Sequence, residues 1–214
     1  MADMLLEQYR SVFSEPVSDS FIYNHIDYMC DIMPEVIFTE EKIMKHINKL
    51  NNNSSPGPDG ISSLCYKKGG QIILDSLIDI YTQMYNESYS PNNSREVWVV
   101  PVWKGSSKLL CVNYRPIALS NQFSKIFESI LREEILEHLS RNGAMDNMQH
   151  GSLSGRSTTS QLLEQLESIM EFMNDGSNCE LIYLDFSKAY DRVDHKILLS
   201  KLEAMGISGK PINS

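Results

Sequence analysis

The sequence predicts an α/β (α+β) fold in which helices outnumber strands. Apolar residues recur at helical spacing in five segments, whereas residues 97–102, 111–119 and 180–185 are rich in β-branched and aromatic side chains. Of the 214 residues 42% are apolar, which is enough to bury a core. The order helix, helix, β-hairpin, helix, helix, strand, helix favours a mixed layered fold over a barrel or sandwich.

The first third of the chain predicts an irregular leader followed by two helices. Residues 1–38 contain Pro16 and Pro34 and show no sustained period. Thr39 is typical of an N-cap, and Ile43 and Ile47 share one face of the helix that follows it. The sequence PGPDGI at residues 56–61 predicts a tight turn. A second helix is expected over residues 71–89, with a face of Leu74, Leu77, Ile78, Tyr81, Met84 and Tyr85.

The middle of the chain predicts a β-hairpin between helices. Residues 97–102 and 111–119 form its strands, and Lys104 and Lys108 lie near its tip. A helix over residues 123–141 ends at Asn142 and Gly143. Thr158 and Gln161 form a capping-box pattern that opens another helix, which Gly176 closes.

Residues 180–195, ELIYLDFSKAYDRVDH, hold the most specific signal in the chain. A buried strand is expected over residues 180–185, followed by a helix over residues 187–205 that ends at Gly206. Asp185 stands at the end of that strand, a common place for a carboxylate that holds a divalent metal or caps a turn. Asp191 and Asp194 are interpreted as surface or capping groups.

Charge is unevenly distributed along the chain. The net charge of −9 argues mildly against nucleic-acid binding. Residues 95–125 nevertheless carry five basic groups and one acidic group, Glu96, whereas residues 126–180 carry three basic and ten acidic groups. On charge alone, an ordinary solvated strand pair explains the basic window equally well.

Composition also bears on location. The chain contains no run of about 18 apolar residues and no signal-peptide pattern at its start, so neither a membrane span nor secretion is expected. Its four cysteines are scattered and fit reduced thiols. We expect an intracellular protein, in the cytoplasm or the nucleus.

Four segments in order resemble the reverse transcriptases of non-LTR (LINE-like) retrotransposons. They are PGPDGI at residues 56–61, WVVPVWKG with NYRPIALSNQFSKIFE within residues 98–128, QHGSLSGRST at residues 149–158, and LIYLDFSKAYDRVDH at residues 181–195. The resemblance covers about residues 40–205. It implies a right-hand polymerase, with residues 39–179 as a fingers-like region and residues 180–214 as the first strand and helix of an incomplete palm.

The resemblance also implies roles for single residues around an incoming deoxynucleoside triphosphate. Asp185 and the backbone carbonyl of Phe186 match ligands of catalytic Mg²⁺. Tyr190 matches the aromatic ring that lies against the sugar and excludes ribonucleotides. Lys104 and Arg115 match fingers residues that fold over the triphosphate, for which the guanidinium fork of arginine is suited.

Further implied partners are an RNA template and a DNA primer. Gly151, Arg156 and Ser157 match a loop along the template strand. In this loop the chain has Ser152 and Leu153 where the family usually has Phe and Arg, which removes one expected template contact.

The second aspartate motif of the family, Y/F-A-D-D, does not occur in these 214 residues. Because one carboxylate does not hold two divalent ions, we expect the isolated chain to be inactive as a polymerase. An unpaired edge of the strand over residues 181–185 would invite self-association. The alternatives are a non-catalytic module that binds RNA or protein, and a portion of a complete polymerase.

Overall fold

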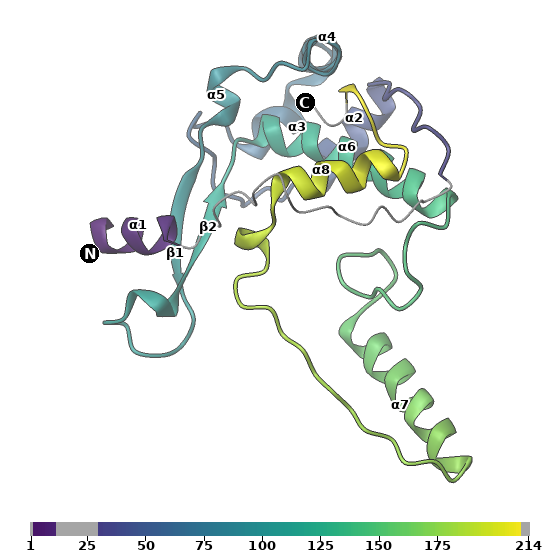
Figure 1. Ribbon diagram of the computed structural model, residues 1–214. Helices are drawn as coiled ribbons and strands as arrows, with labels where there is room; N and C mark the ends of the chain where they lie inside the picture. Colours follow the sequence, from purple (N-terminus) through teal and green to yellow (C-terminus); the bar gives the residue numbers. More distant parts are fainter. Residues whose placement is uncertain (1, 12–29, 211–214) are drawn as a thin grey trace.

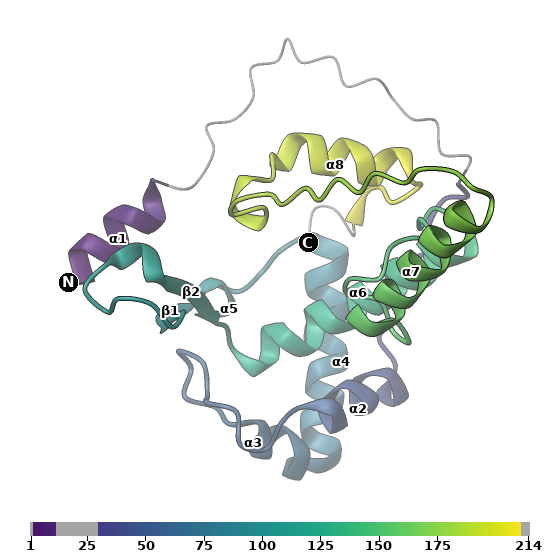
Figure 2. The same ribbon diagram turned by 90° about the horizontal axis from the view of Figure 1, so that it is seen from below.

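The computed structural model describes residues 2–11 and 30–210, so residues 12–29 of the predicted leader lie outside the described part. A helical body lies between a β-hairpin on one side and α7 on the other, and α7 begins an arm that comprises residues 158–186 (Figures 1 and 2). The elements are α1 (Ala2–Arg10), α2 (Glu40–Lys49), α3 (Ser63–Lys68), α4 (Gly70–Glu87), α5 (Asn92–Arg95), β1 (Trp98–Trp103), the 3₁₀ turn η1 (Cys111–Asn113), β2 (Tyr114–Leu119), α6 (Gln122–Arg141), α7 (Thr158–Asn174), the 3₁₀ turn η2 (Tyr190–Arg192) and α8 (His195–Ala204). A mixed fold of helices and a small sheet is thus confirmed.

The predicted start of α2 is confirmed at atomic detail. The Thr39 hydroxyl accepts a hydrogen bond from the Lys42 amide at 3.3 Å, and two glutamates in the first turn suit the positive end of the helix dipole. Ile43 and Ile47 are buried, as their spacing predicted. The face of α4 is confirmed in the same way, because its predicted apolar residues are buried or packed against the core.

Aromatic rings form the centre of the core, where α2, α4 and α6 meet (Figure 2). The ring of Tyr81 on α4 lies 4.9 Å from that of Phe123 and 5.3 Å from that of Phe127, both on α6. The ring of Phe38, just before α2, stacks on Phe127 at 5.4 Å. The Tyr81 hydroxyl donates to the Phe123 carbonyl at 2.8 Å, which satisfies its polar end inside the core.

The predicted turn at residues 56–61 docks against the start of α6. The Gly60 amide donates to the Gly57 carbonyl at 3.0 Å, and Gly60 has a φ of +70°. The Asn121 side chain accepts from the Asp59 amide at 3.2 Å. A Cβ at Gly57 would lie 2.4 Å from Asn121 Oδ1, so this turn needs glycine for close approach as well as for its shape.

The β-hairpin is confirmed, with β1 and β2 antiparallel and Trp98 opposite Leu119. All six residues of β1 are exposed. The hairpin extends away from the helical body beside α1 (Figure 1), and α1 contacts η1. Two strands without a covering layer hold little apolar surface out of water, so the structure presents both faces of this hairpin to solvent.

The helix α7 begins one residue earlier than the pattern predicted. Ser157 is the N-cap, and it forms a reciprocal capping box with Ser160 in place of Thr158 and Gln161. Gly176, with a φ of +72°, follows the end of the helix as predicted. None of the 17 residues of α7 is buried, and the helix projects from the body as part of the arm (Figure 1).

The prediction of a buried strand over residues 180–185 is wrong in this structure. These residues are irregular and exposed, and no described segment pairs with them. A strand requires a hydrogen-bonded neighbour, and β-rich composition does not supply one.

The helix predicted from residue 187 begins only at His195. Lys188 adopts a left-handed conformation with a φ of +54°, and η2 follows it. Asp194 then caps α8 by accepting from the amides of Lys196 and Ile197, which confirms its interpretation as a capping group.

The end of α8 is attached to the body by buried polar contacts. His138 on α6 donates through Nε2 to the Met205 carbonyl at 2.9 Å, and the Met33 amide donates to the Gly206 carbonyl at 2.9 Å. Ile207 is fully buried. The segment after the arm therefore returns to the core. Among the described helices, none combines the length and the apolarity that crossing a membrane requires.

Candidate functional site

The hairpin brings two of the predicted site residues together. Arg115 on β2 lies opposite Val102 on β1, and Lys104 follows two residues after Val102. Because side chains alternate along a strand, Lys104 and Arg115 occupy neighbouring positions on the same face. Both are exposed, and the Lys104 amide donates to the Asn113 carbonyl at 2.8 Å, which fixes the backbone at the tip.

Lys108 has a different environment at the same tip. Its Nζ lies 4.9 Å from the centre of the Trp103 ring, a cation–π distance. The Trp103 indole nitrogen donates to the Ser106 carbonyl at 2.7 Å. Since Trp103 and Val102 are consecutive in the strand, Lys108 is held by the opposite face from Lys104 and Arg115.

Asp185, Phe186 and Tyr190 lie close together in sequence in the segment between α7 and α8, where each is exposed. Phe186 is 79% exposed and Tyr190, the first residue of η2, is 90% exposed. No hydrogen bond or ion pair within the described residues joins Asp185 to Lys104 or Arg115. The structure therefore does not assemble these two groups into a closed site.

A carboxylate and a main-chain carbonyl are suitable ligands for a hard cation such as Mg²⁺. Asp185 and Phe186 supply one of each. Within residues 2–11 and 30–210, however, no three histidine, cysteine or acidic side chains gather where they could hold a metal ion. Asp185 and Phe186 thus offer the types of oxygen ligand that Mg²⁺ prefers, but the described residues around them do not supply a full set of ligands.

The predicted template loop is held by its own side chains. His150 is buried and bonds to the Ser160 hydroxyl and the Glu164 carboxylate, both at 2.9 Å. Arg156 donates to the Asn147 carbonyl and lies 3.3 Å from His150 Nε2. The Ser157 hydroxyl is occupied as the N-cap of α7.

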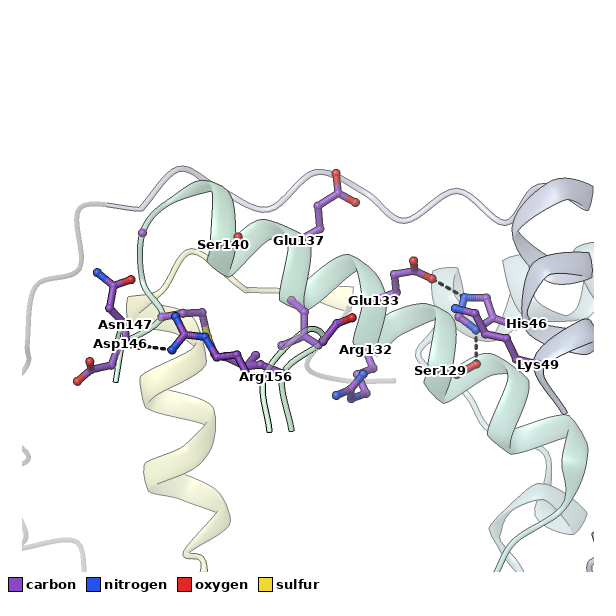
Figure 3. Close-up of a pocket in the computed structure, with 15 residues that line it drawn as sticks. His46, Lys49, Ser129, Arg132, Glu133, Glu137, Ser140, Asp146, Asn147 and Arg156 are labelled. Carbon is purple, nitrogen blue, oxygen red and sulfur yellow. Dashed lines mark hydrogen bonds and ion pairs between the residues drawn. The ribbon is translucent and has the colours of Figure 1, made fainter. Parts of the chain in front are cut away.

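Beside this loop lies a cavity of about 820 Å³ between α2, α6 and residues 143–156 (Figure 3). Its walls carry basic groups, including Lys49, Arg132 and Arg156, and acidic groups, including Glu133 and Glu137. Arg132 spans the cavity wall and donates to the Ser152 carbonyl at 2.7 Å, which ties the loop to α6. The balance of charge distinguishes this cavity from the purely basic hairpin.

One wall of the cavity holds a Ser–His–Glu relay (Figure 3). His46 Nδ1 lies 2.7 Å from the Ser129 hydroxyl and Nε2 lies 2.8 Å from Glu133 Oε2. Ser129 lies inside α6, where the helix uses its amide, and its hydroxyl also contacts the Ile126 carbonyl at 2.8 Å. The relay thus joins His46 on α2 to Ser129 and Glu133 on α6.

Burial sets the protonation of this relay. Desolvation lowers the pKa of His46 below its usual value, although Glu133 opposes the shift. The hydrogen bond from Lys45 lowers the pKa of the Glu133 carboxyl. At neutral pH a neutral His46 therefore donates through Nε2 to an ionised Glu133.

Sequence reasoning missed the partners of two buried histidines, His46 and His150. His46 bridges Ser129 and Glu133, and His150 bridges Ser160 and Glu164. In each case serine and glutamate are four residues apart on one helix and thus one turn apart on one face. The repeated Ser-x-x-x-Glu spacing was the available signal, but it does not say which histidine meets it.

Comparison with known proteins agrees with the motifs. The family model described as reverse transcriptase (RNA-dependent DNA polymerase) matches residues 102–214, more than half of the chain. A probable RNA-directed DNA polymerase from transposon BS of Drosophila melanogaster is 25% identical over 166 residues, which are 77% of this chain and 18% of that protein. A probable RNA-directed DNA polymerase from the X-element of the same organism is 26% identical, covering 80% of this chain and 19% of that protein.

A third relative is the RNA-directed DNA polymerase from mobile element jockey of Drosophila funebris. It is 24% identical over 174 residues, which are 81% of this chain and 19% of the relative. The chain thus spans about a fifth of the length of these curated relatives. The resemblance to the non-LTR, LINE-like type is confirmed, and the chain belongs to the reverse transcriptase family.

Proposed function

We propose that this chain forms the fingers and the opening part of the palm of a reverse transcriptase that copies RNA into DNA. In this proposal residues 39–179 are the fingers-like region, and residues 180–214 belong to the opening part of the palm. The names of the relatives, RNA-directed DNA polymerases, support the activity. Their template, primer and nucleotide substrates are assigned here by that analogy.

The observation that carries the proposal is the pair of cations on one exposed face of the hairpin. Lys104 and Arg115 occupy neighbouring positions there, and residues 97–121 contain no acidic group to neutralise them. A triphosphate needs such a pair, since arginine binds two phosphate oxygens with its planar fork and lysine adds a compact charge. These two residues are proposed to bind the triphosphate of the incoming deoxynucleotide.

Asp185, Phe186 and Tyr190 are proposed to complete the nucleotide site. The Asp185 carboxylate and the Phe186 carbonyl would share in holding Mg²⁺, which supplies charge neutralisation at the triphosphate and activation of the primer hydroxyl. The exposed ring of Tyr190 is free to lie against a sugar. Because two such ions need further anionic ligands, binding is the property to test first on this chain.

The loop over residues 149–157 is proposed to lie along the template strand. Gly151 is exposed and has no side chain, so a nucleic-acid backbone can approach it closely. Arg156 supplies positive charge at the loop. Ser157 acts by fixing the start of α7 through its capping box, and its hydroxyl is not proposed as a direct contact.

The test uses a native reporter. The two tryptophans of the chain, Trp98 and Trp103, both lie in β1, so tryptophan fluorescence reports binding at the hairpin. We expect dCTP with Mg²⁺ to change this emission with an affinity that the double variant Lys104→Ala/Arg115→Ala weakens by about tenfold or more, because two charge-assisted contacts are lost. Lys108→Ala is the matched control, since it removes a cation from the same tip but from the opposite face.

Primer–template binding is measured in parallel by fluorescence anisotropy of a labelled RNA–DNA duplex. We expect affinity to fall as salt rises, with a shallower dependence in the double variant. Equal affinities of the native chain and the double variant for both ligands would contradict the assignment. An effect of Lys108→Ala as large as that of the double variant would also contradict it.

A further inference from the structure

Two exposed apolar surfaces of this molecule carry opposite charge. The arm, defined as residues 158–186, comprises α7 and the extended segment after it, and it carries six acidic groups and no basic group. The hairpin unit, defined as residues 97–121, carries three basic groups and no acidic group. An acidic surface and a basic surface attract each other, whereas two surfaces of the same charge repel each other.

The arm has an uncovered apolar stripe. At about 100° per residue, six side chains of α7 fall within about 120° of the helix circumference. The stripe consists of Leu162, Leu163, Leu166, Ile169, Met170 and Met173. Glu167 and Glu171 border it on one side, and no residue of α7 is buried. An amphipathic helix of this width normally packs on a partner.

The extended segment of the arm lies beside α7, and its backbone forms no strand pairing with the described residues. Gln165 Nε2 donates to the Tyr183 hydroxyl at 3.0 Å, which holds the segment against the helix. Residues 181–186 are exposed, and among the described residues no strand pairs with them. An apolar segment of this composition accepts the edge of another strand.

The hairpin unit has a free strand edge, an exposed apolar face and a cation, all of which complement the arm. Its sheet has two strands, so each strand has one edge without a neighbouring strand in the described residues. Val99, Pro101 and Trp103 form an exposed face, which Lys108 borders at the tip. A strand edge, an apolar face and a flanking cation thus occur on one small element.

The hairpin unit and α7 lie on opposite sides of the helical body (Figures 1 and 2), and no hydrogen bond or ion pair among the described residues joins the hairpin unit to the arm. We propose that they meet between two copies of this chain in a reciprocal dimer. The hairpin of each copy adds its edge to residues 181–185 of the other and covers the stripe of α7 with the face of Val99 and Trp103. Lys108 then faces Glu167 and Glu171, and two-fold symmetry repeats the contact and closes the assembly.

This proposal goes beyond the proposed function. The two proposals share Asp185 and the hairpin, but they are tested at different side chains. Lys104 and Arg115 point from the other face of the hairpin and are not part of the dimer contact. Failure of nucleotide binding would therefore leave the dimer proposal standing, and the reverse is also true.

The test is sedimentation equilibrium of the purified chain at low ionic strength. We expect a species of twice the 24.4 kDa chain mass. The arm variant Glu167→Lys/Glu171→Lys and the hairpin variant Ser106→Glu/Lys108→Glu should each weaken the dimer by about tenfold or more, since like charges then meet at both contacts. An equimolar mixture of the two variants should restore the dimer, because every arm again faces a hairpin of opposite charge.

Rising salt should weaken the dimer of the native chain. Both variants lie outside the core, and an unchanged thermal unfolding midpoint verifies that they fold. A native chain that stays monomeric at every concentration overturns the proposal. Association that ignores salt and both charge reversals overturns it as well, since it indicates unspecific apolar contact, and so does association that appears only when RNA is added.

Discussion

The helical body and the arm are built from similarly amphipathic helices, yet only the body is packed. On α4 the residues at helical spacing, such as Leu74, Leu77 and Tyr81, are at most 4% exposed. On α7 the corresponding residues, such as Leu162 and Leu166, are more than half exposed. An apolar pattern therefore specifies a helix face that needs a partner, but it does not specify which segment that partner is.

The two regions agree in their polar contacts. Both contain a buried histidine that bridges a serine and a glutamate one helical turn apart, His46 in the body and His150 at the base of the arm. Local spacing on a helix creates these contacts in either setting, because the two partners share one face. Apolar packing is what separates the body from the arm.

The largest contrast is expected between matched truncations in the two regions. Tyr81→Ala removes a fully buried ring and the hydrogen bond to Phe123, and it should lower the free energy of unfolding by about 4 kcal/mol. Leu166→Ala on α7 removes a side chain that is 51% exposed and should change it by less than about 0.5 kcal/mol. Urea denaturation followed by circular dichroism measures both, and comparable losses would show that the arm is packed in solution.

A second comparison uses two glycines with similar backbone but different surroundings. Gly206 and Gly176 have φ values of +79° and +72°. A Cβ at Gly206 would lie 2.0 Å from the Asp31 carbonyl oxygen, whereas nothing lies within 4 Å of a Cβ at Gly176. Gly176→Ala should cost about 1 kcal/mol of strain and Gly206→Ala about 1–3 kcal/mol more. Equal costs would mean that the end of α8 is not held against residue 31.

The relay in the body should give a pH dependence that the exposed arm lacks. Burial holds the pKa of His46 below its usual value of 6.5, so the unfolded chain binds more protons once the pH falls through that value. The free energy of unfolding should therefore decrease from about pH 7 downward, until the pH passes the pKa of the folded state. The neutral variant His46→Gln should remove this component of the slope.

Glu133 affects the free energy of unfolding in a separate, lower pH range. Its pKa is lowered by the hydrogen bond from Lys45, so its contribution is present above the usual pKa of 4.5 and is lost at lower pH. Denaturation curves of the native chain and His46→Gln at several pH values check this separation. Parallel curves for the two proteins between pH 7 and pH 5 would refute the role of His46.

The smallest effect is expected from surface ion pairs of the body. Lys42 Nζ lies 2.6 Å from Glu134, but both side chains are partly exposed. Lys42→Ala should lower the free energy of unfolding by at most about 0.5–1 kcal/mol, and added salt should reduce the difference. Lys68→Ala on α3, at an exposed position, is the control. A loss above 2 kcal/mol would place this pair among the core contacts.

The hairpin part of the candidate site could be predicted from the sequence, because its residues are close along the chain. The hairpin follows from two β-rich runs with a short connection, and this alone places Lys104 beside Arg115. The family followed from ordered motifs and is confirmed by the match over residues 102–214. The contact of His46 with Ser129 could not be predicted, since 83 residues separate them and any surface serine satisfies the same pattern.

The helices α2, α4 and α6, the N-cap of α2, the buried faces of α2 and α4, the hairpin and the family could all be predicted from the sequence alone. These depend on local propensity, periodicity and short motifs, which neighbouring residues determine. The tertiary structure was needed to show that α8 begins after Asp194 and that, within residues 2–11 and 30–210, no strand pairs with residues 180–185 and no residue of α7 is buried. Strand pairing and helix packing require a partner elsewhere in space. An amphipathic pattern shows that a face needs such a partner, but it does not show whether the partner is there.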